Sequence, residues 1–297
     1  MSDKVFNQNL EDRAPDQQML MAQLLFSEKP ESASEDALKS ALETNLGKIE
    51  VVGGKTSDGP AMFAVQKLKA VFEDVPQGIP VLACIMEPTE FKSDGIDELQ
   101  RSQFWDFPDG AQKIDDFKYC VNIFNFYGSA LHYQEQAELL LAQVDAALKC
   151  YPKCEGIYVM GSGKLTTPED FEDSKRFDLA GRFIRLAVNA RFFTIQGTED
   201  DAIVDTIGFH IFHEADVQLH FRSINPNFAV SYVYNIASYQ FSNGFPIVAG
   251  DTVDSMDENG NMQWKPQWRT QYEESLVQPI RVVLDVNCGE FAAGTRD

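Results

Sequence analysis

The amino-acid sequence predicts an α+β protein with mixed, largely antiparallel sheets and helices packed on their faces. Three features indicate this class: short apolar runs of strand length, apolar stripes at helical spacing, and turn signals that join successive strands directly. Of the 297 residues, 44% are hydrophobic and 11% aromatic, which is enough to build a large core. We therefore expect an ordered chain with two halves that both begin with a strand, a helix and a second strand.

The N-terminal half is expected over residues 18–110, after a polar lead at 1–17 that we expect to be flexible. Its clearest helix has Ser34 as N-cap, acidic residues in the first turn and Gly47 as the residue that ends it. Strands are predicted from short apolar runs at 19–26, 48–52, 61–68, 71–75 and 79–87.

A surface connection separates the two halves. Residues 87–116 carry nine acidic and three basic side chains, with proline and glycine at intervals, and contain one short helical pattern at 96–104. This composition is typical of a linker between compact regions. We therefore place the internal boundary after residue 110 and expect a C-terminal half over residues 111–297.

The C-terminal half begins with a strand at 117–127, a helix, and a buried strand at 155–161. The helix is predicted from apolar residues at steps of three and four, namely Ala137, Leu140, Leu141, Val144, Ala147 and Leu148. Alternation of apolar and polar residues favours a strand at 183–195. An antiparallel meander continues from it, with strands at 203–212 and 217–221 and a turn between them at 213–216.

A well-capped helix and further strands complete the chain. Asn225 is the predicted N-cap, Pro226 occupies the first helical position, and Gly244 ends the helix. Further strands are expected at 246–253 and 279–286.

Residues 205–253, together with MAQLLFSEKP near the start, resemble a bacterial family known only as domain of unknown function 4261. The family-like positions within the segment are Gly208, Asp216, Asn235, Asp251 and Thr252. The resemblance implies a bacterial, cytosolic α+β protein, and it assigns no activity, cofactor or catalytic residue.

Histidines and carboxylates gather in this segment and raise the hypothesis of a metal or acid–base site. The residues concerned are Asp205, His210, His213, Asp216 and His220. A turn at 213–216 would pair His210 with Leu219 and hold His213 and His220 on the order of 10 Å apart. A zinc ion needs every ligand at about 2 Å, so we expect no metal site and a buried, hydrogen-bonded His210. Candidates for catalysis are His210, Asp205 and Asp251, although both aspartates also fit capping and turn-stabilising roles.

A candidate anion-binding loop lies between a predicted strand and a helix. It consists of Gly161, Ser162, Gly163 and Lys164. A phosphate-binding P-loop would need glycine in place of Tyr158 and a hydroxyl residue after Lys164, and the chain has neither. The alternative is a simple helix start, with Thr167 as N-cap and Pro168 at the first helical position.

Two more patterns occur near the C-terminus. Residues 254–264 resemble a calcium loop in part, but the glycine is misplaced, and Asn259 with Gly260 predicts a hairpin instead. Trp264, Trp268 and Tyr272 share one side of an extended chain. They therefore cover the core or form an exposed aromatic surface for interaction.

Charge and composition restrict the classes of partner. The balance of 25 basic and 46 acidic residues gives a net charge of −21 without any cluster of Lys and Arg, which argues against nucleic acid and anionic membranes. The five cysteines are thinly spread, and Cys150 with Cys154 lacks a second pair for zinc. No apolar run is long enough to span a membrane, and the first residues lack an apolar signal, so we expect a cytoplasmic protein.

These observations favour a non-catalytic protein-interaction module of the adaptor or antidote type, without a cofactor, whose acidic surface binds a basic protein. The acidity also suits solubility alone. The alternative is a hydrolase-like enzyme or a ligand-sensing domain with a site between the two halves. Candidates for that site are His210, Asp205, Asp251 and Lys164.

Overall fold

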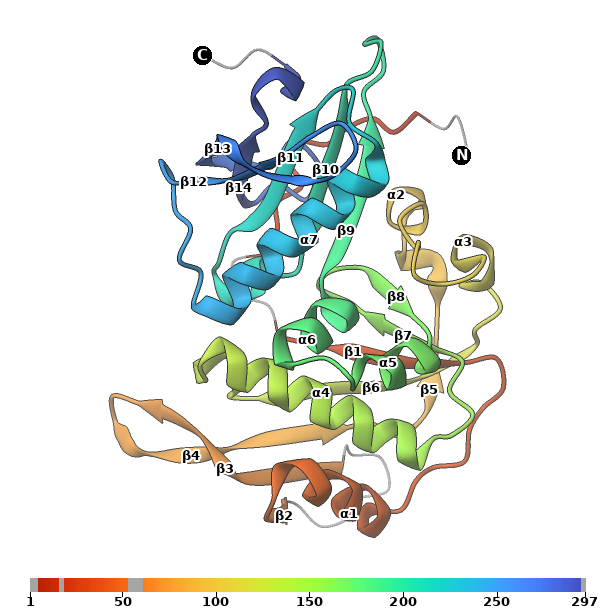
Figure 1. The fold of residues 1–297 in the computed structure, drawn as a ribbon. Coiled ribbons are helices and arrows are strands. Elements are labelled where there is room, and N and C mark those ends of the chain that lie inside the picture. The colour runs from red at the N-terminus through yellow and green to blue at the C-terminus, as the bar shows by residue number, and fades with distance from the viewer. Residues whose placement is uncertain (1–4, 16–18, 53–60, 295–297) are drawn as a thin grey trace. The chain divides into compact units, whose positions relative to one another are not determined.

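The computed structural model describes residues 5–15, 19–52 and 61–294. The chain divides into a first unit, residues 18–187, and a second unit, which combines residues 1–17 with 188–297 (Figure 1). Both units contain helices and mostly antiparallel sheets, which confirms the α+β class.

The division differs from the expected boundary after residue 110. Strand β6 (Tyr119–Phe126) pairs with β1 (Ala22–Phe26) on one side and with β4 (Val75–Ile85) on the other. Because one sheet contains strands from both expected halves, those halves do not form separate bodies.

The first unit holds an eight-stranded sheet within its described residues, in the order β2-β3-β4-β6-β1-β7-β8, with β5 paired to β6. All its pairings are antiparallel. The strands not yet given are β2 (Ile49–Val52), β3 (Ala61–Phe72), β5 (Thr89–Glu90), β7 (Gly156–Val159) and β8 (Lys164–Thr166). The turn expected between β2 and β3 lies at 53–60, outside the described residues.

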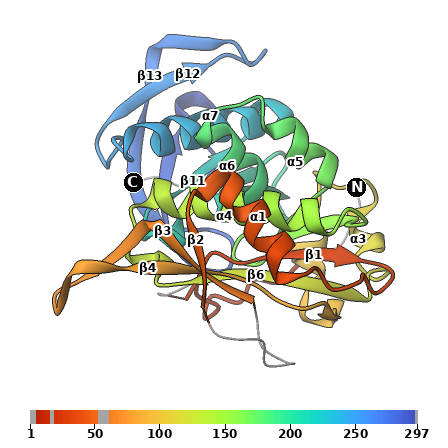
Figure 2. The same cartoon turned by 90° about the horizontal axis from the view of Figure 1, so that it is seen from below.

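Four helices of the first unit contact one another in a layer. Helix α4 crosses strands β1, β4 and β6, packs against α1 and contacts α6, which in turn contacts α5 (Figures 1 and 2). The predicted caps of α1 are confirmed, since the Ser34 side chain accepts from the Ala37 amide and Gly47 has φ 69°. The bounds are α1 (Glu35–Leu46), α4 (Tyr133–Cys150), α5 (Pro168–Ser174) and α6 (Leu179–Ala187).

Residues 87–117 fold over one face of this sheet. Short helices α2 (Glu98–Arg101) and α3 (Gly110–Lys113) lie in this connection, and its aromatic side chains enter a buried cluster with the sheet. The cluster comprises Leu25, Phe91, Ile96, Phe104, Phe107, Ile114, Phe117, Cys120, Tyr158 and Leu165. The connection predicted at the surface therefore contributes to the core.

The second unit has a six-stranded sheet in the order β12-β13-β14-β11-β10-β9 within its described residues. Strands β11 and β14 are parallel, and the other pairs are antiparallel. Helix α7 (Pro226–Asn243) packs on β9, β10 and β11. The strands are β9 (Asn189–Thr194), β10 (Ala202–Ile207), β11 (Asp216–Phe221), β12 (Thr252–Met256), β13 (Met262–Glu274) and β14 (Val282–Asn287).

The caps predicted for α7 are confirmed: Asn225 accepts from the Asn227 amide, Pro226 begins the helix, and Gly244 ends it with φ 79°. The described part of the lead is bound to this unit, because the Ala14 amide donates to the carbonyl of Ile280 at 3.0 Å. The flexibility expected of the lead stays a prediction.

The strand predicted at 183–195 is wrong in its first part. Helix α6 ends at Ala187 and β9 begins at Asn189. Buried residues of α6 also follow helical steps of three and four, at Ala180, Phe183, Ile184 and Ala187. The Asp178 carboxylate accepts from the Gly181 amide at 2.9 Å and caps the start, which is a signal that alternation alone misses.

The predicted pairing of β10 and β11 is also wrong. The observed register pairs Val204, in place of His210, with Leu219. Residues 210–212 form a 3-10 turn, and His213 ends it with φ 61°. The connection is therefore a longer loop than 213–216, and His210 lies outside the strand.

Candidate functional site

Asp205 lies at the centre of a buried ionic cluster in the second unit. Arg191 on β9 binds its carboxylate through two nitrogens, with Nε–Oδ1 at 2.9 Å and Nη2–Oδ2 at 2.6 Å. Arg281, just before β14, adds Nη2–Oδ2 at 2.9 Å. Each side chain is almost completely buried. Both lone-pair regions of the carboxylate are therefore engaged inside the protein.

Asp216 forms the second anion of the cluster. Its Oδ2 lies 3.1 Å from Arg281 Nε and 3.3 Å from His210 Nδ1, and its Oδ1 accepts from the Phe209 amide at 3.0 Å. Burial alone would raise the pKa of Asp216, but the hydrogen bond with His210 and the charge of Arg281 outweigh it and lower that pKa. The carboxylate is held ionised.

The cluster has balanced charges, two carboxylates against two guanidinium groups. Burial alone would lower the pKa of Arg281, but the charges of Asp205 and Asp216 outweigh it and raise that pKa. Buried charges persist only when they are paired and hydrogen-bonded, and here each has those partners. The arrangement suits fixing three strands and a loop together better than it suits proton transfer to a substrate.

The other catalytic candidate, Asp251, lies at the surface and closes a turn. Its Oδ2 accepts from the Val248 amide at 2.9 Å, just before β12 begins. The predicted strand at 246–253 is therefore a turn over most of its length. Asp251 and Asp205 share no hydrogen bond, and the turn-stabilising role foreseen for Asp251 is the one observed.

The candidate anion loop forms the turn between β7 and β8. Lys164 is only 4% exposed, and its Nζ lies 2.8 Å from Asp106 Oδ2, so an internal carboxylate already neutralises its charge. The helix start is confirmed, because Thr167 Oγ1 accepts from the Asp170 amide at 3.0 Å and Pro168 begins α5. The geometry favours this alternative over anion binding.

The described residues do not include a set of side chains that is assembled to bind a metal ion. No group of three or more His, Cys, Asp or Glu side chains is placed there to hold an ion. The five cysteines are free thiols. Helices long and apolar enough to span a bilayer are also absent from the part of the chain that the structure describes.

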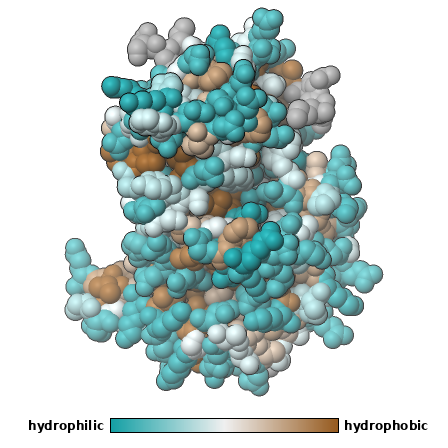
Figure 3. Space-filling model, in the orientation of Figure 1, coloured by the Kyte–Doolittle hydropathy of each residue, from teal (hydrophilic) through white to brown (hydrophobic). Residues whose placement is uncertain are grey.

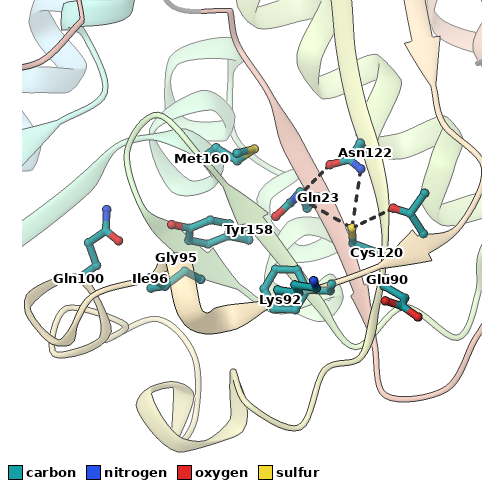
Figure 4. A pocket seen from close by; sticks show the side chains of 12 residues that line it. Gln23, Glu90, Lys92, Gly95, Ile96, Gln100, Cys120, Asn122, Tyr158 and Met160 are labelled. Atoms are coloured by element: carbon teal, nitrogen blue, oxygen red, sulfur yellow. Dashed lines mark hydrogen bonds between the residues drawn. The ribbon is translucent and has the colours of Figure 1, made fainter.

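A pocket of about 350 Å³ lies in the first unit, between the sheet and the connection that covers it (Figure 4). Gln23, Cys120, Asn122 and Tyr158 contribute from strands β1, β6 and β7. Residues of the connection complete the lining, among them Thr89, Glu90, Lys92, Ile96 and Gln100. All these residues belong to one unit, so the pocket is complete within it.

Cys120 lies at one end of this pocket. Its Sγ lies 3.6 Å from Thr89 Oγ1, 3.7 Å from Asn122 Nδ2 and 3.8 Å from Gln23 Nε2. Burial raises the pKa of the Cys120 thiol, and the hydrogen bonds from Thr89 and Asn122 offset this only in part. A lowered pKa favours a nucleophilic cysteine, and the raised pKa of Cys120 does not favour that role.

Exposed apolar side chains lie on the hairpin formed by β12 and β13. Met262 is 52% exposed, Trp264 71% and Tyr272 48%, whereas Trp268 is buried against Tyr232 of α7. Trp268 therefore covers the core, as one of the two predictions had it, whereas Trp264 and Tyr272 are exposed. The predicted turn at Asn259 and Gly260 joins the two strands.

Sequence reasoning missed the arginines of the ionic cluster and the polar residues of the pocket. Arg281 stands next to the apolar run VVLDV, and a charged residue in such a run signals a buried ion pair. Gln23 and Asn122 are likewise polar residues inside strands that otherwise read as buried. Neither of these sequence patterns shows which residue the buried polar side chain contacts.

The comparison with known families bears on the second unit. Residues 205–287 match the family model described as Domain of unknown function (DUF4261). The expected resemblance is thus confirmed for 205–253 and extends through β14. MAQLLFSEKP lies outside the matched residues. Neither the curated proteins nor the solved structures contain a match to this chain.

The DUF4261-like segment contains most of the ionic cluster. Asp205, Asp216 and Arg281 lie within it, and Arg191 lies outside. The family description assigns no chemistry, so the similarity supports a shared fold element. A cluster that fixes the strands of that element is consistent with this.

Proposed function

We propose that the protein is a non-catalytic protein-interaction module, of the adaptor or antidote type, which binds a basic protein through an acidic surface. The observation that carries the proposal is the exposed Trp264 on the β12–β13 hairpin, whose sequence contains more acidic than basic residues. Aromatic residues that are exposed in the free protein are frequent anchors of interfaces.

The overall charge favours a basic partner. The net charge of −21 produces a field that attracts positively charged surfaces and accelerates encounter at low salt. In the view of Figure 3 the surface is mainly hydrophilic, with apolar residues in separate small areas. An acidic body suits a partner that is recruited by charge and then anchored at one exposed aromatic side chain.

The hairpin offers such an anchor. Residues 252–274 contain five acidic and two basic side chains. Strand β12 is at the end of the sheet order, so its outer edge has no strand beside it in the described residues. Figure 2 shows β12 and β13 as a long hairpin at the margin of the second unit, beside α7. A partner can therefore approach both the edge and the exposed aromatic residues.

The residues considered for catalysis support the same proposal. Asp205 and His210 are engaged inside the ionic cluster, Asp251 closes a turn and Lys164 is paired with Asp106. None of the four lines the pocket of the first unit. These four side chains are therefore poorly placed to meet a substrate in that pocket.

The test compares three forms of the full chain as bait in lysate of the native host: wild type, Trp264→Ala and Trp105→Ala. Trp105 is 50% exposed and lies in the first unit, so it is a matched control. Each captured protein is identified and purified, and its affinity for the three forms is measured at low and high salt.

We expect a basic partner whose affinity falls at least about tenfold with Trp264→Ala, stays unchanged with Trp105→Ala, and falls with salt. Equal affinity for all three forms, or an interaction that does not weaken with salt, would contradict the proposal.

A further inference from the structure

The pocket of the first unit is built on a row of polar side chains that crosses three strands. Asn122 on β6 is directly opposite Gln23 on β1, and Gln23 is directly opposite Tyr158 on β7. Directly opposed residues of antiparallel strands point to the same face. Gln23 Nε2 donates to Asn122 Oδ1 at 2.8 Å, so the amides hold each other in place (Figure 4).

This row interrupts an otherwise apolar face. Leu25 and Cys120 are the next residues on this face of the same two strands, and they lie opposite each other in the buried cluster. Leu165 of the same cluster lies opposite Tyr158. Polar groups placed next to a core cost free energy unless they find partners. Gln23 and Asn122 are partners for each other in part, and the remaining polar atoms of the row are open to a ligand in the pocket.

Two atoms of the row have unused hydrogen-bonding capacity. Within the described residues, neither the Tyr158 hydroxyl nor Gln23 Oε1 has a hydrogen bond, although Tyr158 is only 5% exposed. Burial raises the pKa of Tyr158 to about 12, so the phenol is neutral and can donate. The two groups offer a ligand one donor and one acceptor.

Lys92 supplies the charge. It lines the pocket and forms no ion pair in the described part of the chain, and Figure 4 shows it between Tyr158 and Cys120 in that view. An ammonium group and a phenolic donor that line one pocket together favour a carboxylate. At the end of the pocket near Tyr158, the side-chain amide of Gln100 has no hydrogen bond either among the described residues.

The size of the pocket limits the ligand. A volume of about 350 Å³ is at the lower end of small-molecule sites, which span about 300–1,000 Å³. Such a volume fits a molecule the size of an amino acid and excludes dinucleotides and folded peptides. Gln23 Oε1 additionally requires a hydrogen-bond donor on the ligand.

We propose that this pocket binds a small organic carboxylate that also carries a hydrogen-bond donor, of the size of a free amino acid. The carboxylate binds Lys92 and the Tyr158 hydroxyl, and the donor binds Gln23 Oε1. This site is independent of the protein partner proposed above, because it lies in the first unit and uses none of the hairpin residues.

The experiment uses the purified full chain and a panel of probes. The panel contains the twenty protein amino acids and small hydroxy- and dicarboxylic acids, each with its primary amide as the counterpart that lacks the carboxylate charge. Ligand-observed NMR identifies the binders, and calorimetry measures Kd for wild type, Lys92→Met, Tyr158→Phe and Lys153→Met. Lys153 is an exposed lysine of the same unit outside the pocket and serves as the control.

We expect at least one acid with Kd below about 1 mM and an amide counterpart at least about tenfold weaker. Lys92→Met and Tyr158→Phe each weaken binding at least about fivefold, and Lys153→Met leaves it unchanged. The proposal is overturned if no acid binds below about 1 mM, if the amide binds as tightly, or if Lys92→Met matches Lys153→Met. Circular dichroism of each variant verifies that the fold is retained.

Discussion

Arg281 and Asp205 form an ion pair inside the second unit, with Arg281 Nη2 at 2.9 Å from Asp205 Oδ2 and both side chains almost completely buried. Arg281 also binds Asp216 through Nε at 3.1 Å. One guanidinium group thus holds two strands, β10 and β11, beside the start of β14. We therefore expect the sheet of the second unit to depend on this side chain.

Arg281→Met should destabilise the second unit by about 3–5 kcal/mol, because it leaves two buried carboxylates without their shared cation. Denaturant unfolding measures the loss. Arg222→Met is the control, since Arg222 pairs with Asp201 through a side chain that is about half exposed, and it should cost less than about 1 kcal/mol. Equal losses in the two variants would show that the buried pair contributes no special stability.

The Asp145 carboxylate should make the stability of the first unit depend on acid pH. Burial alone would raise its pKa, but hydrogen bonds from Lys149, Lys175 and Asn45 outweigh it and lower the pKa below the ordinary 3.8. A lowered pKa contributes stability that is complete above 3.8 and is lost as the pH falls through the folded-state value.

Asp145→Asn should therefore cost about 1.5–3 kcal/mol at neutral pH, and the difference from wild type should shrink below pH 3.8. Unfolding curves at a series of pH values measure this difference. Glu138→Gln, an exposed carboxylate of the same helix, should follow wild type throughout. A difference that stays constant with pH would exclude the ionised carboxylate as its source.

Tyr158→Phe should leave the free energy of unfolding within about 0.5 kcal/mol of wild type, because its hydroxyl has no hydrogen bond among the described residues. Tyr232→Phe is the comparison: Tyr232 donates to the Asp254 carbonyl at 2.7 Å, and its loss should cost about 1 kcal/mol. Thermal or denaturant unfolding ranks the two. A larger loss for Tyr158→Phe would mean that its hydroxyl serves the fold.

Gly260→Ala should destabilise the β12–β13 hairpin. A Cβ there would lie 2.6 Å from the Phe228 ring, and φ is 78°. Gly197 has a similar φ of 89° but open space around it, so Gly197→Ala has the backbone strain alone, about 1 kcal/mol. Gly260→Ala should cost about 1 kcal/mol more. A double variant with Gly260→Ala and Phe228→Ala should lack this excess. If the losses of the two single variants instead add up in the double variant, the contact with Phe228 is not the cause of the excess.

Local signals explain which elements could be predicted from the sequence. Ser34, Thr167 and Asn225 each cap a helix with a side chain that bonds within three residues, so the interaction is visible in a short window. The strand predicted through α6 fails because Ile184 fits both a period of two with Leu186 and a helical stripe with Ala187.

The pocket and the ionic cluster could not be predicted, since they depend on strand pairing over long separations. Gln23 is about a hundred residues from Asn122, and Arg281 is 76 residues from Asp205. The polar residue in an apolar run is visible, but the register that gives it a neighbour is set by the packing of the whole sheet.

The second unit is discontinuous in the chain, because residues 8–14 bind near Ile280 while residues 18–187 form the first unit. Two peptide links therefore tether one unit to the other. A single protease cut near residue 187 leaves both still joined, and a recombinant fragment that starts at residue 188 loses the segment that covers Gln278 and Ile280. Expression of the second unit by itself thus calls for the amino-terminal residues spliced directly onto β9.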